Sequence, residues 1–528
     1  MIHHSPLPDV EVPDLALTEY VLAGGAGQPE KPALIDAVSG RVLTYGELER
    51  AIGSLAGGLA AAGFGPGDVL ALLAPNMPEY AVAFHGVAVA GGAITTINPA
   101  YTEAEVHHQL ADSGARILVT IAPLVDAAVR ACAGSSVAEV YVLGEAGDVD
   151  GPGWDDRALP VRPLSALYGP PPAGQVPVEP DDVVALPYSS GTTGLAKGVM
   201  LTHRNLVANV AQTLGAIPAA PDDLVMAVLP FFHIYGMQCM MNCGLRSGGT
   251  VVTLPRFDLE QFLRAHQDYR ITRSFVAPPI VLALARHPMV DEFDLSHLRL
   301  MNSGAAPLKA ELAAEASKRL GCEVVQGYGM TELSPVSHLT PTGWFRPGSV
   351  GITAPNTQTL IVDSVTGADL DTGEEGEVWV RGPQVMKGYL NNSQATAATL
   401  DADGWLHTGD LGYIDADGHL YIVDRLKELI KYKGFQVPPA ELEAVLLRHS
   451  DVADAAVIGL PDEEAGEVPV GYVVLRPGAA ASAEDIMRFV AGEVANYKQI
   501  RRLEVIDAIP KSAAGKILRR ELRDSAST

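Results

Sequence analysis

The first 345 residues alternate short apolar runs with longer stretches that have the spacing of amphipathic helices. The runs include RILVTI at 116–121, VYVLG at 140–144 and VVALPY at 183–188, and one helical stretch is TYGELERAIGSLAGGLAAAG at 44–63. Strands separated by helices of this length form parallel sheets that helices cover. The sequence therefore predicts an α/β fold, with sheets flanked by helices in a large N-terminal domain.

The length and composition exclude several classes of protein. A chain of 528 residues is too long for one hydrophobic core, so we expect roughly two to four domains. Hydrophobic residues make up 48% and charged residues 19%, which excludes an intrinsically disordered chain. The formal net charge of −26 argues against a general affinity for nucleic acid or anionic membranes.

Membrane insertion and secretion are not expected. The most apolar stretch, YAVAFHGVAVAGGAITTI at 80–97, is interrupted by a histidine and three glycines, and predicts a core helix followed by a strand. The first residues, MIHHSPLPDVEVPDL, lack a basic segment followed by an apolar one, so they do not resemble a signal peptide. With only four cysteines we expect a cytoplasmic protein with buried free thiols rather than a metal site. These cysteines are Cys132, Cys239, Cys243 and Cys322.

After about residue 345 the pattern changes to short alternating strands and turns rich in glycine and aspartate. Examples are GEVWVRG at 376–382 and GHLYIVDR at 418–425, and Asp417-Gly418 is a strong signal for a tight hairpin turn. We expect antiparallel hairpins here, in a β-barrel-like subdomain of the large domain.

A smaller α+β domain is predicted at the C-terminal end, where ELIKYKGFQVPPAELEAVLLRH at 428–449 opens a new mixed pattern. We place the border between an N-terminal domain, 1–426, and a C-terminal domain, 427–528. From Glu428 to the end the chain carries 13 Lys and Arg against 16 Asp and Glu, so this part repels an anionic ligand less than the rest. The Pro-rich stretch at 168–182 is predicted to be a connector.

The stretch YSSGTTGLAKG at 188–198 combines glycines, hydroxyl side chains and one lysine. Glycines let backbone N–H groups converge on an anion, hydroxyls add donors, and the lysine adds a charge, so the stretch favours a polyphosphate site. It is not a Walker loop, because Ala196 and Gly198 occupy positions where that motif has Gly and Ser or Thr. A flexible surface loop is the open alternative.

Four further segments follow in a fixed order: QGYGMTELSP at 326–335, GWLHTGDLGYI at 404–414, VDRLKELIKYKGFQVPPAELE at 423–443 and PKSAAGKILRREL at 510–522. Together with the loop they resemble the adenylate-forming superfamily of acyl-CoA synthetases, luciferases and adenylation domains, and most of all the 4-coumarate:CoA ligases. The resemblance covers essentially the whole chain. It implies a mobile C-terminal domain that acts as a lid.

The resemblance implies an ATP site. The loop would hold the β- and γ-phosphates, Tyr328 would lie against adenine, Thr331 would contact the α-phosphate, and Asp410 and Arg425 would bind the ribose. Glu332 would hold Mg²⁺, a cation that prefers oxygen ligands. Taken alone, Tyr328 is more typical of a packed aromatic and Glu332 of a solvated acid, and Asp410 is also typical of a turn cap. The full nucleotide set is Ser189, Ser190, Gly191, Thr192, Thr193, Gly194, Lys197, Gln326, Gly327, Tyr328, Gly329, Thr331, Asp410 and Arg425.

In the C-terminal domain the resemblance makes Lys516 the adenylation lysine, which would bridge the acid and the α-phosphate. Lys427 matches the hinge, and a second face would guide the thiol of coenzyme A. Without the resemblance, Lys516 is one more basic residue of a solvated helix, as we expect of Arg519, Arg520 and Arg523. The lysines of the second face could equally guard a strand edge. This face comprises Lys431, Lys433, Gly434 and Gln436.

The acyl pocket is also implied by the resemblance. His233 would lie beside the reacting carboxylate, although a lone histidine is more often a core residue. Glycines opposite a tyrosine would make a flat, narrow slot for a planar aromatic acid. Plant coumarate ligases usually carry lysine where Asn302 stands, which leaves the choice among cinnamate-like acids open. The remaining lining residues are Ile234, Tyr235, Gln238, Gly304, Ala305, Gly327, Gly329, Pro335, Val336 and Ser337.

The sequence thus predicts an AMP-forming ligase that joins a cinnamate- or 4-coumarate-like acid to coenzyme A through an acyl-AMP, with ATP and Mg²⁺. A medium-chain fatty acyl-CoA ligase is the near alternative, and a luciferase-like oxygenase or a non-catalytic binding protein are others. We expect small-molecule partners only, and a monomer or homodimer.

Overall fold

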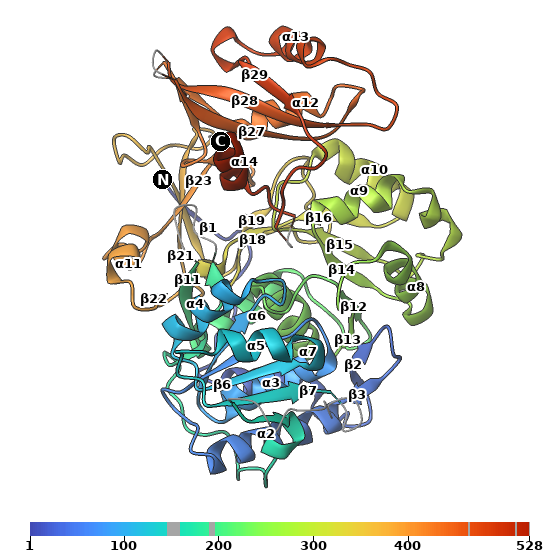
Figure 1. The fold of residues 1–528 in the computed structure, drawn as a ribbon, viewed down its shortest axis with the longest axis vertical. Coiled ribbons are helices and arrows are strands. Elements are labelled where there is room, and N and C mark those ends of the chain that lie inside the picture. Colours follow the sequence, from blue (N-terminus) through green and yellow to red (C-terminus); the bar gives the residue numbers. More distant parts are fainter. Residues whose placement is uncertain (145–158, 190–195, 434, 463–464, 513–514, 527–528) are drawn as a thin grey trace.

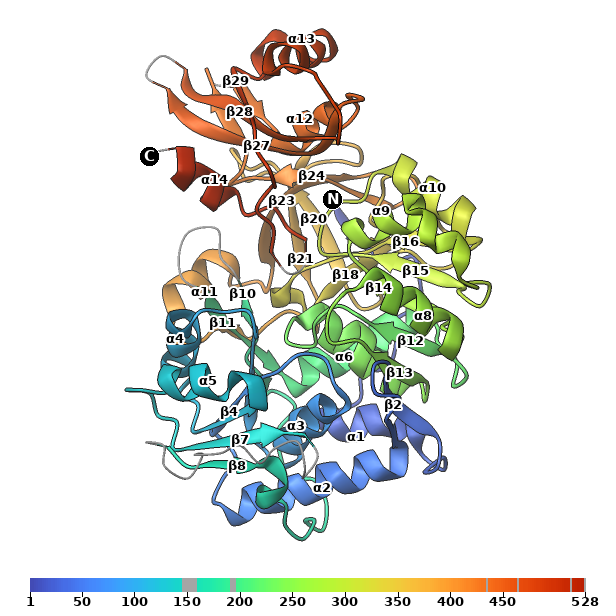
Figure 2. The same cartoon turned by 45° about the vertical axis from the view of Figure 1, so that its right-hand side comes forward.

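The structure is a computed structural model that describes residues 1–144, 159–189, 196–433, 435–462, 465–512 and 515–526. Figures 1 and 2 show a large body and a smaller C-terminal domain at one end of the longest axis. The large body holds two mostly parallel sheets and two antiparallel ones, and the small domain has a sheet of its own. The α/β fold with a small α+β domain that the sequence predicts is confirmed.

The first sheet has nine strands, and the six that run from β9 (Val183–Ala185) to the edge strand β8 (Val161–Pro163) are parallel. RILVTI, VYVLG and the start of VVALPY form three of these strands, as predicted. Antiparallel strands that carry the ends of the 188–198 stretch complete one edge. In spatial order the strands are β10 (Tyr188–Ser189), β11 (Lys197–Thr202), β9 (Val183–Ala185), β5 (Ala93–Ile97), β4 (Val69–Leu73), β6 (Ile117–Ile121), β7 (Glu139–Leu143) and β8 (Val161–Pro163), and β22 (Gly388–Tyr389) also pairs with β11.

The second sheet has seven strands, and all pairs except the last are parallel. Its order is β16 (Glu323–Gln326), β15 (Leu300–Ser303), β14 (Arg273–Val276), β12 (Leu224–Ala227), β13 (Thr250–Thr253), β2 (Pro32–Asp36) and β3 (Val42–Thr44). The three strands β14, β15 and β16 end at the same edge, because Val276, Ser303 and Gln326 are register partners.

Helix α3 (Pro78–Val89) lies between the two sheets, where it contacts β4 and β5 of the first and β2 of the second. Nearly all of its residues are buried, which explains why the sequence is apolar all round rather than amphipathic. The predicted helix-then-strand at 80–97 is therefore α3 followed by β5. The other helices of the large body are α1 (Leu17–Leu22), α2 (Tyr45–Ala61), α4 (Glu103–Ser113), α5 (Val125–Ala131), α6 (His203–Ala216), α7 (Cys243–Arg246), α8 (Leu259–Tyr269), α9 (Pro278–Arg286), α10 (Ala310–Leu320) and α11 (Ser393–Thr399).

The region after residue 345 is antiparallel, as predicted, and the antiparallel pairing begins earlier than predicted, at Tyr328. Asp417-Gly418 forms the turn between β23 (Leu406–Ile414) and β24 (Leu420–Arg425). Gly418 has a φ of +85°, which a glycine adopts without strain. A bridge between Ile352 and His419 joins the two sheets, so the subdomain is barrel-like without being one closed ring. One sheet has the order β1 (Ile2–His4), β20 (Gln358–Val362), β21 (Gly376–Arg381), β23 (Leu406–Ile414), β24 (Leu420–Arg425), and the other β17 (Tyr328–Gly329), β18 (Val336–Leu339), β19 (Ile352–Thr353).

The small domain packs helices on a five-stranded sheet and has its own hydrophobic core, which includes Ile430, Leu442 and Val457. Its strands are β26 (Phe435–Val437), β25 (Ile430–Tyr432), β28 (Gly466–Leu475), β27 (Val452–Asp462) and β29 (Arg502–Val505), and its helices α12 (Pro439–Leu446), α13 (Ala483–Glu493) and α14 (Arg519–Ala526).

Three other sequence predictions can be compared with the structure. All four cysteines are buried free thiols, as expected. The stretch 168–182 contains no helix or strand, as a connector should. In the part of the chain that the structure describes, no helix has both the length and the apolar character needed to cross a membrane.

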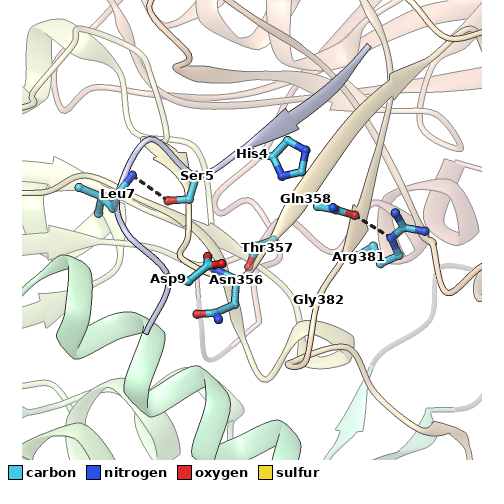
Figure 3. A pocket seen from close by; sticks show the side chains of 9 residues that line it. All are labelled: His4, Ser5, Leu7, Asp9, Asn356, Thr357, Gln358, Arg381 and Gly382. Atoms are coloured by element: carbon cyan, nitrogen blue, oxygen red, sulfur yellow. Dashed lines mark hydrogen bonds between the residues drawn. The ribbon is translucent and has the colours of Figure 1, made fainter. Parts of the chain in front are cut away.

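A polar cavity of about 490 Å³ opens where the N-terminal strand joins β20 and β21 (Figure 3). His4, Asp9 and Arg381 are among the side chains that line it, and Arg381 donates to Gln358 there. None of its lining residues belongs to the predicted nucleotide or acyl site, so the cavity is separate from that site.

Candidate active site

The predicted nucleotide and acyl residues gather where β14, β15 and β16 end. Asn302 is the penultimate residue of β15, Gly304 follows that strand, and Gln326 ends β16. Ligands of open parallel sheets bind outside the carboxyl ends of the strands, so this edge is the expected position for a site. The Gln326 side chain accepts a hydrogen bond from the backbone N–H of Leu308, 2.8 Å away, and so fixes the loop after β15.

Tyr328, Asp410 and Arg425 form one connected group. The Tyr328 hydroxyl donates to Asp410 Oδ2 at 2.6 Å, and Arg425 Nε lies 3.1 Å from Asp410 Oδ1. The β23–β24 hairpin explains the second contact, because it places Asp410 and Arg425 directly opposite each other. Burial and the Asp410 charge raise the pKa of Tyr328. The predicted adenine and ribose residues are therefore together, around a carboxylate that could accept from ribose hydroxyls.

Glu332 is buried and accepts two hydrogen bonds from residues distant in sequence. Ser189 Oγ donates to its carboxylate at 2.9 Å and the Tyr389 hydroxyl at 2.8 Å. Lys197 Nζ lies 4.3 Å from the centre of the Tyr389 ring, a cation–π contact. The lysine of the 188–198 stretch and the predicted metal carboxylate thus share one tyrosine. Tyr389 was not predicted, and no local sequence pattern marks it.

The chemistry of this cluster fits Mg²⁺. Glu332 supplies one carboxylate, and among the described residues no group of three or more His, Cys, Asp and Glu side chains gathers around a point. Mg²⁺ in nucleotide sites binds one or two carboxylates and takes its other ligands from phosphates and water. A site with a single carboxylate beside a phosphate loop therefore suits this ion.

Most of the predicted phosphate loop lies outside the described residues, namely Ser190, Gly191, Thr192, Thr193 and Gly194. Its two flanks are described, and both contact α4. The Tyr188 hydroxyl donates to Asp112 Oδ2 at 2.6 Å, and His108 Nε2 lies 3.2 Å from the Ala196 carbonyl oxygen. His108 and Asp112 are four residues apart on α4, so one helix face holds both flanks.

Lys516 lies at this same site. Its pKa falls from 10.5 to about 8, first because of burial and then because of the positive charge of Arg425, while Glu428 and Asp410 act in the opposite direction. The preceding Gly515 packs on the start of α9, since a Cβ there would lie 3.2 Å from Pro279. The small domain therefore carries Lys516 to the residues of the large domain.

The predicted second face of the small domain is elsewhere. Lys431 lies on β25 and Lys433 follows it, and both side chains are exposed. The charges that act most strongly on Lys516 are those of Arg425, Glu428, Asp410 and Arg519 instead. Lys427, the predicted hinge residue, is exposed between β24 and β25. Gly434 and the side chain of Gln436 lie outside the described residues.

His233 and Tyr235 approach the nucleotide residues from the segment after β12. Burial and the charge of Lys516 lower the pKa of His233 to about 4, so its imidazole is neutral near neutral pH. The Tyr235 hydroxyl donates to the backbone and side-chain oxygens of Asn302 at 3.2 and 3.4 Å. A Cβ on Gly304 would lie 3.0 Å from the Tyr235 ring, so the hydroxyl end of this ring packs directly on the glycine. Ile234 is fully buried next to them.

The other predicted acyl residues differ in what their side chains do. Gln238 lies on a π-helix (Gly236–Asn242), and its amide donates to the Leu206 carbonyl at 3.0 Å. Gln238 is 1% exposed, so it shapes the wall of the predicted acyl pocket without offering a free polar group. Gly329 packs so closely on Pro335 that a Cβ would lie 2.0 Å from the Pro335 carbonyl oxygen. The remaining residues, Ala305, Gly327, Val336 and Ser337, lie on the loops and strands at the same edge.

Two features of the predicted acyl pocket were not predicted from the sequence. Asn209 on α6 exchanges two hydrogen bonds with the backbone of Val336, at 2.8 and 3.2 Å. Behind Tyr235, a small cavity of about 20 Å³ is lined by Cys239 and Phe275 among others. Phe275 contacts Tyr235 edge to face, with the ring centres 6.3 Å apart. The helical spacing of Cys239 and Cys243 could have placed both cysteines at this cavity. The packing of Tyr235 on Phe275 could not have been predicted from the sequence.

Comparison with known proteins agrees with this geometry. The model of the AMP-binding enzyme family matches residues 23–390, and the model of the AMP-binding enzyme C-terminal domain matches 441–516. The chain belongs to the AMP-binding enzyme family. The predicted domain border at 427 falls between the two matched ranges.

Among curated relatives, 4-coumarate–CoA ligase 3 of Oryza sativa subsp. japonica is 44% identical over 99% of this chain and 94% of its own. The resemblance that the motifs indicated is confirmed, and with it the interpretation of the chain as an AMP-forming acid–thiol ligase.

Solved structures of the family add information on the relative position of the domains. ATP-bound MatB from Rhodopseudomonas palustris is 30% identical, covers 97% of this chain and 99% of its own, and has a TM-score of 0.88. The apo form of the same protein, with the same coverage, has a TM-score of 0.76. An anthranilate CoA ligase in complex with anthranoyl-AMP, 25% identical over 97% of both chains, has a TM-score of 0.86. This chain is therefore more similar to the ATP-bound arrangement of MatB than to the apo one.

Proposed function

We propose that the protein activates a planar aromatic acid of the cinnamate or 4-coumarate type with ATP and transfers the acyl group to coenzyme A. The observation that supports this most strongly is the meeting of Lys516 with His233, Asp410 and Arg425, residues from three separate parts of the chain. The names of the curated relatives point to the same class of acid.

In the first half-reaction a carboxylate oxygen attacks the α-phosphorus of ATP, the bond to the bridging oxygen breaks, and pyrophosphate leaves. Both reactants are anions, so fixed positive charge is the main requirement. Lys516 would neutralise the approaching carboxylate and α-phosphate, and Thr331 would donate to that phosphate. The loop with Ser189 and Lys197 would hold the leaving pyrophosphate. Asp410, with Arg425 and Tyr328, would fix the ribose and adenine.

Mg²⁺, held by Glu332, would supply charge neutralisation on the phosphates when bound. Ser189 and Tyr389 orient the carboxylate of Glu332 through their hydroxyls. Neutral His233 would lie beside the reacting carboxylate without adding a charge that competes with Lys516.

In the second half-reaction the thiol sulfur of coenzyme A attacks the acyl carbon, the bond to the phosphate oxygen breaks, AMP leaves and the thiol proton is lost. Lys516 has no part in this step. We propose that the C-terminal domain, 427–528, turns about Lys427 so that the face with Lys431, Lys433, Gly434 and Gln436 meets the acyl-AMP. The present arrangement would then be the one for adenylation, which agrees with the greater similarity to the ATP-bound relative.

The preference for a flat aromatic acid rests on the slot between Tyr235 and the glycines. The Tyr235 ring lies against Gly304. A Cβ on Gly327 would lie 3.8 Å from the Asn302 amide oxygen, so the glycine leaves the space beside this amide open. Asn302 can meet the far end of the acid and hydrogen-bond a para-hydroxyl. An alkyl chain offers no hydrogen-bonding group to this amide, whose oxygen already accepts from Tyr235.

A panel of acids tests the proposal, with AMP release measured in the presence of ATP, Mg²⁺ and coenzyme A. We expect 4-coumarate and cinnamate to be turned over well and octanoate poorly. In an Asn302→Ala variant, the preference for 4-coumarate over cinnamate should fall, because the para-hydroxyl loses its partner. Strong turnover of octanoate with none of 4-coumarate would contradict the proposal.

A further inference from the structure

Helix α12 is the first helix after the hinge, and the large domain contacts its beginning through Asp424. This residue is on β24, is buried, and precedes Lys427 by three positions. Its Oδ2 accepts a hydrogen bond from the backbone N–H of Ala440, 2.9 Å away, in the first turn of α12. The first N–H groups of a helix lack partners within it and carry partial positive charge, so a carboxylate stabilises this end.

The large domain contacts the other end of α12 through Lys309. Its Nζ donates to the Ala444 carbonyl oxygen at 3.1 Å. The carbonyl groups in the last turn of a helix are partly negative and need an outside donor, which a lysine provides. Glu311, Arg448 and Glu443 are the other charges that act on Lys309. An acid and a base of the large domain thus hold the two ends of one helix of the small domain, each at the end of the helix dipole that it complements.

We propose that Asp424 and Lys309 form an orientation latch, a pair of positioning residues that holds the small domain in the adenylation arrangement. The inference rests on the two-orientation mechanism proposed above. Both residues precede Lys427 and α12 follows it, so a turn about Lys427 separates both contacts at once. The latch must therefore open before the second half-reaction.

Arg519 connects the latch to Lys516. It lies three residues after Lys516, its side chain is only 11% exposed, and its guanidinium bonds to Glu428 and, at 2.7 Å, to Glu443. Its positive charge also acts on Asp424. The bonds of Arg519 to Glu428 and Glu443 stay within the small domain and move with it, so only the attraction to Asp424 depends on the orientation. When the latch is closed, the start of α14 and the Lys516 loop before it are held at the site.

The test compares the two half-reactions in latch variants. Adenylation is measured as acid-dependent exchange of pyrophosphate into ATP, and thioester formation from supplied 4-coumaroyl-AMP and coenzyme A in a single turnover. A hydrogen bond of this kind shifts an equilibrium by about three- to tenfold. We expect Lys309→Ala to raise the ratio of thioester formation to adenylation by that factor, Asp424→Asn to raise it in the same direction, and Lys309→Arg to restore it.

Lys318→Ala is the matched control, because Lys318 is an exposed lysine on the same helix, α10, that follows Lys309. Its ratio should equal that of the unmodified protein. A merely structural role of Lys309 would lower both half-reactions together and leave the ratio unchanged, and this result would overturn the latch. If the unmodified protein forms no thioester from any acid, the proposed function fails instead.

A second measurement needs no chemistry. Because the four native cysteines are buried, spin labels can be confined to Ala314→Cys on α10 and Arg488→Cys on α13, both exposed positions. In the presence of ATP we expect one dominant distance between the labels, and a second population that grows about three- to tenfold when Lys309→Ala is added. An unchanged distribution in that variant would overturn the proposal.

Discussion

The pH dependence of adenylation is the sharpest prediction for Lys516. Burial and the neighbouring charge of Arg425 lower the pKa of this lysine from 10.5 to about 8. Only the protonated form can bridge two anions, so the active fraction falls as the pH rises through this value. From about pH 7 to about pH 9 the protonated fraction drops from roughly 90% to roughly 10%, and kcat/KM for ATP should drop about tenfold.

The assay is acid-dependent pyrophosphate exchange, with kcat/KM for ATP measured across this range, because kcat/KM reports the groups of the free enzyme. Lys516→Arg is the matched variant, since a guanidinium stays charged throughout. Its absolute rate will be lower because of its different geometry, but its profile should be flat where that of the unmodified protein falls. A flat profile of the unmodified protein to about pH 10, or the same decline in Lys516→Arg, would refute the assigned role of this lysine.

Three further predictions concern the division of labour in the site. Lys516→Ala should reduce pyrophosphate exchange by about a thousandfold, because an ion pair at about 4 Å with an effective dielectric constant near 20 contributes roughly 4 kcal/mol. The same variant should still convert supplied 4-coumaroyl-AMP to thioester. Lys427→Pro, which restricts the hinge, should do the reverse, and equal damage to both half-reactions would count against two orientations. Tyr389→Phe keeps the ring under Lys197 but removes the hydroxyl bonded to Glu332, so the Mg²⁺ concentration for half-maximal exchange should rise about tenfold. An unchanged Mg²⁺ titration would show that this hydroxyl does not orient the carboxylate.

The parts of the fold that sequence could predict are those fixed by local pattern. The apolar run at 80–97 had to be buried whatever its partners, and it is α3 followed by β5. The hairpin at Asp417-Gly418 follows from its turn residues, and it places Asp410 opposite Arg425. Motif residues that directly follow strands, such as Gly304 and Gly327, could be assigned to one edge because parallel strands end together.

The contacts within the site could not be predicted, since they join residues that are distant in the chain. Glu332 accepts from Ser189, 143 residues earlier, and from Tyr389, 57 residues later. Tyr389 occurs in an ordinary Gly-Tyr-Leu sequence with no chemical signature. Likewise Asn209, which holds the backbone of Val336, belongs to a helix whose pattern indicates only burial.

The expectation that Arg519, Arg520 and Arg523 all lie on a solvated face was wrong for Arg519. Its side chain is 11% exposed, against 73% for Arg520. The reason is helical spacing: Leu522, three residues after Arg519, is the buried residue of α14, and residues three apart share a face. The prediction treated the three arginines alike, although their side chains differ in exposure. The position of the apolar residue within the run was the signal that could have separated Arg519 from its neighbours.

The hydrogen bonds that Asp424 and Lys309 make between the domains also have a physical reason. A large apolar interface would hold one orientation too firmly, because opening it would expose hydrocarbon to water at about 25 cal/mol per Å². A hydrogen bond can be exchanged for one to water at a small net change, on the order of 1 kcal/mol. Asp424 and Lys309 make two such contacts, so the closed arrangement is favoured and still able to open. An enzyme that needs one domain at the nucleotide twice, in two orientations, requires contacts of this strength.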